Sequence, residues 1–205
     1  ENYKPRIEID PDWELIELEK LCYFKRGPFG GSLKKEIFVD KGFKVYEQKN
    51  AINDNFEIGN YYITKEKFIE MQGFVLKPFD LIISCSGTMG RVAIAPKNIK
   101  PGIINQALLK LTPIHQKADP FFIKYILESD FIKNKYFSNT SGAAIQNVSS
   151  VKHLKKITIP KLSLSKQQNI VKQIMVELEI VNSNKELIKI FEKKINDKIE
   201  AVWKK

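Results

Sequence analysis

The sequence contains few of the residues on which disulfide and metal chemistry depend. Its 205 residues include two cysteines and two histidines, and Cys22 and Cys85 are far apart and lack a CxxC spacing. Neither His115 nor His153 completes a pattern of metal ligands. We therefore expect ordinary buried or half-buried thiols in a reducing cytoplasm, and no metal site.

The chain also lacks any run of about 18 apolar residues, so the sequence predicts no membrane-spanning helix. No basic-then-apolar signal segment opens it, and the localisation we expect is cytoplasmic. The first residue is Glu1 rather than Met, which favours a piece of a longer polypeptide or a processed product. Because 43% of the residues are hydrophobic, we expect a folded core rather than a disordered tail.

Motifs of the common enzyme classes are missing as well. An amino-methyltransferase needs an Asn/Asp-Pro-Pro-aromatic turn and a Gly-rich loop for S-adenosylmethionine, but Asp119-Pro120-Phe121-Phe122 has the wrong third residue and no such loop beside it. Residues 27–32 hold three glycines, yet no Gly-Lys-Ser/Thr follows, so they do not form a Walker loop. The sequence therefore predicts no catalytic residues, although residues distant in sequence can assemble an active site.

Positive charge is what the sequence has in excess. Lysine and arginine total 34 against 24 aspartates and glutamates, which gives a net charge of +10. A field of this size attracts polyanions and speeds their encounter with the protein. The alternative is a lysine-rich surface encoded by an AT-rich genome, so charge alone does not decide whether the partner is a nucleic acid.

The chain after Pro160 has the pattern of one long helix. Ser165 and Gln168 fit a capping box, and neither glycine nor proline follows up to Lys205. Apolar residues recur at alternating spacings of three and four, which is the heptad seam of a helix that packs along a partner helix. The residues predicted to pair are Val171, Ile174, Leu178, Val181, Ile188, Ile195, Ile199 and Val202.

Two charged residues, Lys185 and Glu192, occupy seam positions, where they are expected to fix the register or to pair with each other's partners, at a cost in stability. A helix from Lys166 to Trp203 would be roughly 57 Å long. A compact domain of this size is only about 30–40 Å across. We therefore expect the helix to project and to pair with another helix; the alternative is a helix that lies across its own domain.

The first part of the chain alternates short apolar runs with turns and helices, so we predict an α+β fold with a mixed or largely antiparallel sheet, and a long coiled-coil-type helix after it. Thr64 is expected to cap a helix that ends near Met71, and Asp119 to cap one that continues, with a break, to about Tyr136. Loops are expected at 25–36 and 138–150. The predicted domains are 1–162 and 163–205, and the predicted strands are 44–46, 61–63, 81–84, 91–94, 107–111 and 157–159.

Several short strings, spread in order along the chain, resemble one protein family. They are Pro11-Asp12-Trp13-Glu14, Gly31-Ser32, Phe79 to Ser84, Ser86-Gly87-Thr88-Met89-Gly90-Arg91, Ile104-Asn105-Gln106-Ala107, Asp119 to Phe122, Ser141 to Val148, Leu154 to Pro160, and Gln168 with Ile170-Val171. Each is weak alone, and the order and spacing carry the resemblance. Together they resemble the specificity (S) subunit of type I restriction-modification systems, or the equivalent C-terminal part of a fused restriction-methyltransferase.

The resemblance implies a target-recognition domain over 1–162, which reads one half of a bipartite double-stranded DNA site, and a spacer and dimerisation helix over 163–205. It implies an associated adenine-N6 methyltransferase, which binds S-adenosylmethionine, and restriction subunits as partners, with no cofactor in this chain. Full-length S subunits carry two of each element and this chain has one. It is therefore a piece of a longer S subunit, a half-subunit that forms a homodimer, or the tail of a fused enzyme.

Polar side chains of the predicted loops are the candidates for DNA contacts. Glutamine and asparagine suit adenine, arginine suits guanine, and cationic side chains neutralise phosphates. For each residue the alternative is a solvated loop position or a turn former, and Gln106 is set aside as a structural residue of the strand it opens. The candidates are Ser32, Lys34, Lys35, Gln48, Lys49, Asn50, Thr88, Arg91, Gln146 and Asn147.

Three other functions stay open at this point. A small nuclease or methyltransferase would bind a metal or S-adenosylmethionine as the isolated chain. A coiled-coil adaptor would bind protein through its helix and show no salt-sensitive affinity for DNA. An RNA-binding module would prefer RNA in a competition, although the aromatic and glycine strand signatures of common RNA-binding folds are missing.

Overall fold

The computed structural model describes residues 14–29, 31–85, 90–134 and 151–203. The chain separates into two compact units, a globular unit of residues 1–164 and a helical unit of residues 165–205. The mixture of helices and sheets followed by a long helix confirms the predicted fold class. The polar loop that we predicted over 138–150 lies outside the described residues.

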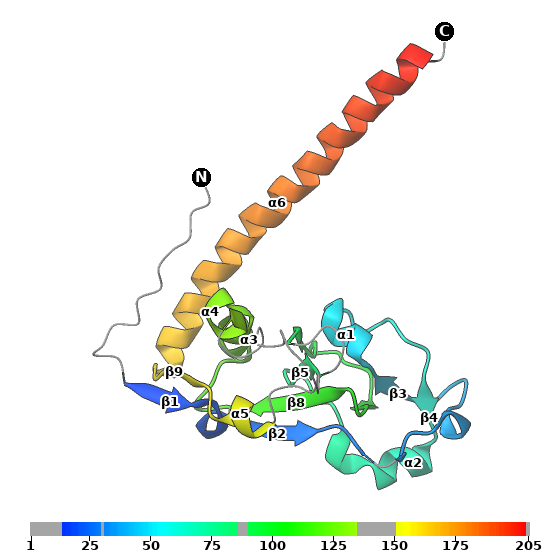
Figure 1. The fold of residues 1–205 in the computed structure, drawn as a ribbon, viewed down its shortest axis with the longest axis vertical. Coiled ribbons are helices and arrows are strands. Elements are labelled where there is room, and N and C mark those ends of the chain that lie inside the picture. The colour runs from blue at the N-terminus through cyan, green and yellow to red at the C-terminus, as the bar shows by residue number, and fades with distance from the viewer. Residues whose placement is uncertain (1–13, 30, 86–89, 135–150, 204–205) are drawn as a thin grey trace, which may run out of the picture. The chain divides into compact units, whose positions relative to one another are not determined.

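The centre of the globular unit is a four-stranded antiparallel sheet (Figure 1). In spatial order its strands are β2 (Cys22–Arg26), β8 (Leu108–Pro113), β5 (Leu81–Ser84) and β6 (Val92–Ile94). All four residues of β5 are buried, as expected of a short apolar run between two partner strands. The strands predicted near β5, β6 and β8 are confirmed, whereas the end of β2 lies where we predicted a loop.

A second sheet contains three strands in the order β4 (Tyr62–Ile63), β3 (Phe43–Tyr46) and β7 (Gly102–Ile104). β3 runs antiparallel to β4 and parallel to β7, so the strand pairing of the fold is mixed. A Cβ atom at Gly102 would lie 2.2 Å from the carbonyl oxygen of Lys44, which is why glycine is needed where these two strands meet. We predicted β3 and β4 but not β7.

The first and last strands described in the globular unit form a two-stranded antiparallel ribbon, β1 (Leu15–Glu17) with β9 (Thr158–Pro160). The Nζ atom of Lys156 lies 3.0 Å from the Glu17 carboxylate and 2.9 Å from that of Glu19. The hydrogen bond from Lys156 holds the pKa of Glu19 below its ordinary value. Residues from opposite ends of the globular unit are therefore tied together at this ribbon.

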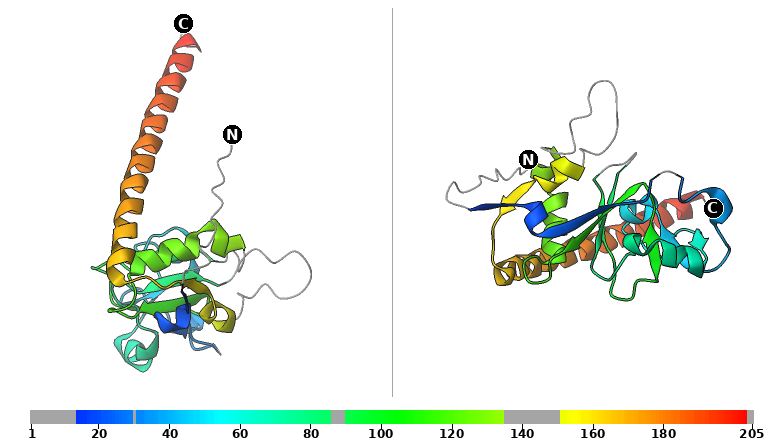
Figure 2. Two further views of the ribbon diagram at one scale, coloured as in Figure 1. Left: turned by 90° about the vertical axis from the view of Figure 1, so that its left-hand side faces the viewer. Right: turned by 90° about the horizontal axis from the view of Figure 1, so that it is seen from below.

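Short helices connect and cover the strands. Their bounds are α1 (Gln48–Ile52), α2 (Lys65–Glu70), α3 (Pro120–Glu128), α4 (Asp130–Ile132) and α5 (Val151–Lys155). The predicted caps are confirmed: Thr64 Oγ1 accepts from the Lys67 amide at 3.3 Å, and Asp119 Oδ1 accepts from the Phe121 and Phe122 amides at 2.9 and 3.0 Å. The expected break falls between α3 and α4. Figure 2 shows α3 lying across the central sheet.

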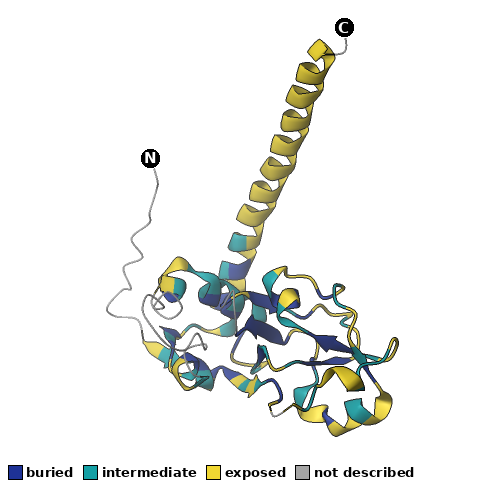
Figure 3. Cartoon of the chain, turned by 45° about the vertical axis from the view of Figure 1, so that its right-hand side comes forward, coloured by how far each residue is buried: buried dark blue, intermediate teal, exposed yellow. Residues whose placement is uncertain are grey.

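Within the globular unit the buried residues concentrate on the strands, and many exposed residues lie on the loops and short helices around them (Figure 3). One buried carboxylate connects the core segments: Asp80 accepts hydrogen bonds from the Lys77 amide at 2.9 Å and from Thr112 Oγ1 at 2.5 Å. The Lys110 ammonium lies 3.5 Å from the same carboxylate. A buried charge is tolerated only when it is paired in this way, so Asp80 fixes the turn before β5 against β8.

The helical unit is formed by α6 (Leu164–Trp203), a helix of 40 residues. It begins one residue before Ser165, the predicted N-cap, and the predicted long helix is otherwise confirmed. Every described residue from Met175 onward is exposed. Among the described helices none is both long and apolar enough to cross a bilayer. That the helix projects from its own domain stays a prediction.

Candidate nucleic-acid interface

One end of the four-stranded sheet carries several predicted contacts, at the point where β2 and β5 end and β6 and β8 begin. The register fixes this arrangement, because Arg26 pairs with Leu109 and Ser84 pairs with Leu108. Arg91, just before β6, donates its amide to Ser84 Oγ at 3.0 Å. We call this region the loop end. It comprises residues 27–29 and 31–35, Arg91 and the turn 105–107.

The segment after β2 is held against the turn 105–107 by backbone contacts. The Gly27 amide donates to the Leu108 carbonyl at 2.9 Å, and a Cβ atom at Gly27 would lie 1.8 Å from the Asn105 carbonyl oxygen. Ser32 Oγ donates to the Phe29 carbonyl at 2.8 Å, which closes the turn around Gly31 with its positive φ of 74°. Ser32, a predicted contact, thus keeps its oxygen lone pairs as acceptors.

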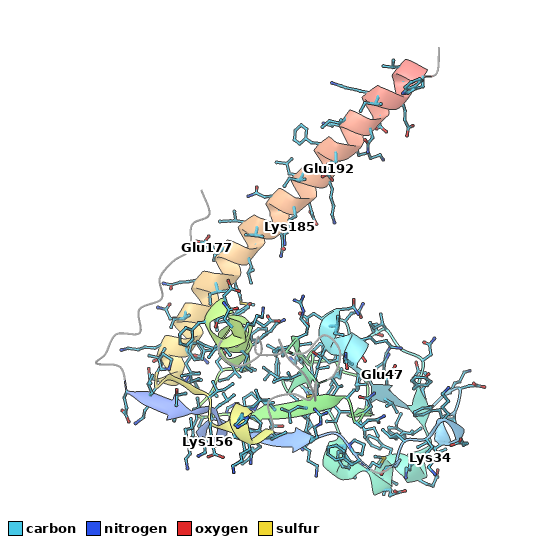
Figure 4. The ribbon with its side chains drawn as sticks, in the orientation of Figure 1. Lys34, Glu47, Lys156, Glu177, Lys185 and Glu192 are labelled. Carbon is cyan, nitrogen blue, oxygen red and sulfur yellow. The ribbon has the colours of Figure 1, made fainter. Side chains whose placement is uncertain are left out.

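The exposed cations of this region differ in how far their charges are compensated. Among the described residues Lys34, Lys35 and Arg91 form no ion pair and are exposed. Lys49 is also exposed, but its Nζ atom lies 2.8 Å from Glu47 Oε2. Figure 4 shows Lys34 and Glu47 at the same end of the globular unit. The three uncompensated cations are the better suited to phosphates.

An aromatic pair joins the loop of Lys34 and Lys35 to the segment that carries Lys49. The rings of Phe38 and Tyr61 are stacked with their centroids 4.5 Å apart. The Lys49 Nζ atom lies 5.7 Å from the centroid of the Tyr61 ring. The Phe38–Tyr61 pair therefore connects the segment that follows Lys34 and Lys35 to the ring that Lys49 contacts.

Asn50 has a structural position, which corrects our prediction that it contacts DNA. Its side chain is fully buried, and Oδ1 accepts from the Glu47 amide at 2.7 Å. Its Nδ2 donates to the Asn55 and Ile58 carbonyls at 2.8 and 2.9 Å. Because both ends of the amide are used inside the loop that follows α1, no part of it is available to a base. The neighbouring Gln48 is half-buried.

Two residues at the loop end were not among the predicted contacts. Phe29 has 69% of its surface exposed, and Gln106 is exposed at the turn before β8. Both line a small notch with other loop-end residues. The sequence signal for Gln106 was its place beside Asn105, which we interpreted as the beginning of a strand. Thr88, Gln146 and Asn147, the other predicted contacts, lie outside the described residues.

Both cysteines of the described globular unit are buried. Burial raises the pKa of the Cys22 thiol to about 12 and that of Cys85 to about 11, so both stay protonated at neutral pH. Burial also lowers the pKa of Lys44, whose Nζ atom donates to the Glu57 carbonyl at 2.8 Å. In the part of the chain that the structure describes, no group of three or more His, Cys, Asp or Glu side chains could hold a metal ion.

Residues 11–201 match the family described as the type I restriction modification DNA specificity domain. The chain belongs to this family. The resemblance on which the sequence analysis relied is thus confirmed over nearly the whole chain. The loop end and most of α6 therefore lie within the matched specificity domain.

Two curated members of the specificity family are similar to this chain. The putative type I restriction enzyme MjaX specificity subunit of Methanocaldococcus jannaschii is 30% identical over 195 residues, which cover 92% of this chain and 42% of that protein. The type I restriction enzyme EcoBI specificity subunit of Escherichia coli is 21% identical over 175 residues, which cover 85% of this chain and 36% of that protein. The chain thus spans about two fifths of the length of these relatives.

Solved structures of specificity subunits share the fold. The HsdS subunit from Thermoanaerobacter tengcongensis superimposes with a TM-score of 0.63 at 18% identity, covering 88% of this chain and 41% of that chain. The S subunit of a type I restriction-modification system from M. genitalium gives a TM-score of 0.53 at 21% identity, covering 93% and 46%. The α+β unit followed by a long helix is therefore a shared architecture.

Proposed function

We propose that this chain recognises one half of a bipartite double-stranded DNA site and directs an associated adenine-N6 methyltransferase and restriction subunits to that site, in the cytoplasm. Membership of the type I specificity family over residues 11–201 is the observation that carries the proposal. The loop end supports it independently, because polar and cationic side chains are exposed there, namely those of Lys34, Lys35, Arg91 and Gln106.

The proposed contacts divide into two classes. Lys34 and Lys35 bind phosphates, which position the protein on the duplex, together with Lys49, whose charge Glu47 partly compensates. Arg91, Ser32 and Gln48 contact base edges, and arginine suits guanine. Thr88, Gln146 and Asn147 remain predicted DNA contacts. Asn50 is no longer one, because its side chain is buried.

The chemistry belongs to the partner in this proposal. The methyltransferase binds S-adenosylmethionine and receives the target adenine after the base leaves the duplex. The chain itself needs no cofactor, and its contribution is the choice of the DNA sequence. It is therefore a recognition subunit rather than an enzyme.

The helix α6 supplies the contacts between subunits. Besides the predicted seam it carries a second apolar stripe, which lies roughly 150° around the helix at 100° per residue. The stripe consists of Val176, Ile180, Leu187 and Ile190, each at least half exposed. One partner helix covers only one face. We therefore assign the exposed part of the seam, from Leu178 onward, to a second S-type helix, from a second copy or from the rest of a longer subunit, and the stripe to the methyltransferase. Val171, which we predicted to pair, is only 6% exposed within this chain and leaves the pairing set.

Selection from a random duplex DNA library tests the proposal, with the chain alone and with the modification subunit encoded by the same genome. The expected result is enrichment of one short sequence by the chain, and of a gapped site by the complex. Affinity should fall steeply with salt because phosphate contacts release counterions. A chain that enriches no sequence and shows no salt-dependent affinity would contradict the proposal, and would favour the adaptor.

A further inference from the structure

A notch of about 130 Å³ opens at the loop end of the sheet. Its walls come from two segments that are far apart in the sequence, the one after β2 and the one between β7 and β8. The lining residues are Pro28, Phe29, Gly31, Ser32, Leu33 and Gln106. Most of the lining is apolar or backbone, and the Gln106 amide is the largest polar group in it.

The size of the notch limits what it can hold. Pockets for drug-sized ligands and cofactors measure roughly 300–1,000 Å³, so a whole nucleotide does not fit. A cavity of roughly 150 Å³ is enough for a benzene-sized group. The notch therefore suits one small apolar group that projects from a larger surface, with a hydrogen-bonding partner at its rim.

Both segments that carry the notch are internally braced. Asn105 Oδ1 accepts from the Ala107 amide at 3.0 Å, and the Asn105 amide donates to the Tyr46 carbonyl at 2.9 Å, which fixes the turn that presents Gln106. On the other side the Ser32 hydroxyl donates to the Phe29 carbonyl at 2.8 Å. Side chains on braced turns lose little conformational freedom when they bind a ligand.

The two most prominent side chains of the notch are left available by this bracing. Phe29 has 69% of its surface exposed, and its ring centroid lies 6.0 Å from the Arg26 guanidinium carbon. Gln106 is exposed, and its side chain forms no hydrogen bond with another residue of the described ranges. An exposed aromatic ring beside an unoccupied amide, next to cations, is an arrangement that suits the edge of a base pair.

We propose that this notch reads one A·T base pair through the major groove. Gln106 binds adenine, donating to N7 and accepting from the N6 amino group, and the thymine methyl group enters the notch against Phe29. The A·T pair is the base pair that offers these adenine groups and a methyl group on the same groove edge. This inference rests on the proposed function and assigns a specificity-determining role to Gln106, for which the sequence predicts a structural role.

The test begins with the site that the wild-type chain selects from random duplex DNA. At each A·T pair of that site, thymine is replaced by deoxyuridine, which removes only the methyl group and leaves the protein unchanged. At the pair read by the notch, the affinity should fall about fourfold, as expected for one apolar carbon. The same replacement should have no effect on the variant Phe29→Ala.

Variants of Gln106 test the hydrogen-bonding half of the proposal. Gln106→Ala should lower affinity for the selected site by about 5- to 150-fold and remove the preference at that one pair. Gln106→Glu should move the preference toward cytosine, because a carboxylate accepts from the cytosine amino group. The control is Gln116→Ala, since Gln116 is also exposed and follows the other end of β8.

The possible outcomes distinguish a failure of this inference from a failure of the proposed function. A wild-type chain that selects a sequence, with variants of Gln106 that select the same sequence with the same affinity, overturns the inference and leaves the proposed function standing. Indifference to deoxyuridine at every A·T pair overturns the methyl contact. A wild-type chain without any sequence preference overturns both. Circular dichroism of each variant checks that the fold is intact.

Discussion

The two units of the chain differ in whether their polar and apolar side chains find contacts within the unit. In the described part of the globular unit, the buried side chains of Asp80 and Asn50 have hydrogen-bond partners inside the unit. In α6 the apolar side chains are exposed along most of the length of the helix, and they supply most of the exposed large apolar residues among those described. Apolar surface of this extent marks a site of association. The difference indicates that these core polar groups are satisfied within the globular unit, whereas the exposed apolar surface of the helix favours a partner.

The largest expected effect concerns the interior of the globular unit. Asp80→Ala leaves the Lys110 ammonium without its carboxylate and removes the acceptor of Thr112 and of the Lys77 amide. The free energy of unfolding should fall by about 3–5 kcal/mol, which urea denaturation can measure. The control is Asp54→Asn, because the Asp54 carboxylate pairs with Lys124 at the surface with 54% of its side chain exposed, and asparagine tolerates the positive φ of 46° at this position. That control should cost less than about 1 kcal/mol.

Equal losses in the two aspartate variants would contradict the view that Asp80 connects the core segments. The helix offers the complementary comparison, because its exposed apolar residues, from Met175 onward, should matter for association and hardly for the stability of the isolated chain.

Two isoleucines lie on different faces of α6, so variants of them test the two faces separately. Ile188 lies on the predicted seam and Ile190 on the second stripe, and they are 56% and 52% exposed. Ile188→Asp should weaken self-association by roughly 2–4 kcal/mol, as for the loss of a large apolar side chain at an interface. Sedimentation velocity at several concentrations measures this. Ile190→Asp should leave self-association unchanged and weaken binding of the modification subunit instead; the same effect of both variants would refute the assignment of separate faces.

A smaller effect is expected at the loop end. Arg91→Ala should weaken binding of the selected DNA by about 1–3 kcal/mol and relax the preference at one base pair, if the guanidinium reads a guanine. Lys34→Ala should weaken binding to all sequences alike and reduce the salt dependence by about one counterion. Fluorescence anisotropy with the selected and a scrambled duplex distinguishes the two. An Arg91→Ala variant with an unchanged preference removes Arg91 from the set of base contacts.

The elements predicted well were those whose signals are local. The apolar run Leu81–Ser84 indicated a buried strand, Thr64 and Asp119 indicated helix N-termini, and the heptad spacing indicated α6. Each of these signals depends on neighbours within a few residues. Local sequence therefore sufficed for the fold class and for most of the element positions.

The element and the residues that were predicted wrongly depend on contacts between segments that are far apart in the sequence. β7 is a strand because Gly102 allows close pairing with β3, which lies more than 50 residues earlier. Asn50 looked like a base reader, but the carbonyls of Asn55 and Ile58 occupy its amide. Gln106 became a candidate only when the fold placed it beside Phe29. Residue type indicates what a side chain can bind, whereas tertiary structure decides whether it is available.

The central claim, that the globular unit reads sequence through its loop end, is tested most directly by comparing two duplexes. Affinity of the chain is measured by anisotropy for the selected sequence and for a scrambled duplex of the same composition, at roughly 50 and 200 mM salt. We expect the selected duplex to bind at least about 1,000-fold more tightly, and both affinities to fall with salt. Equal affinities for the two duplexes would contradict the account.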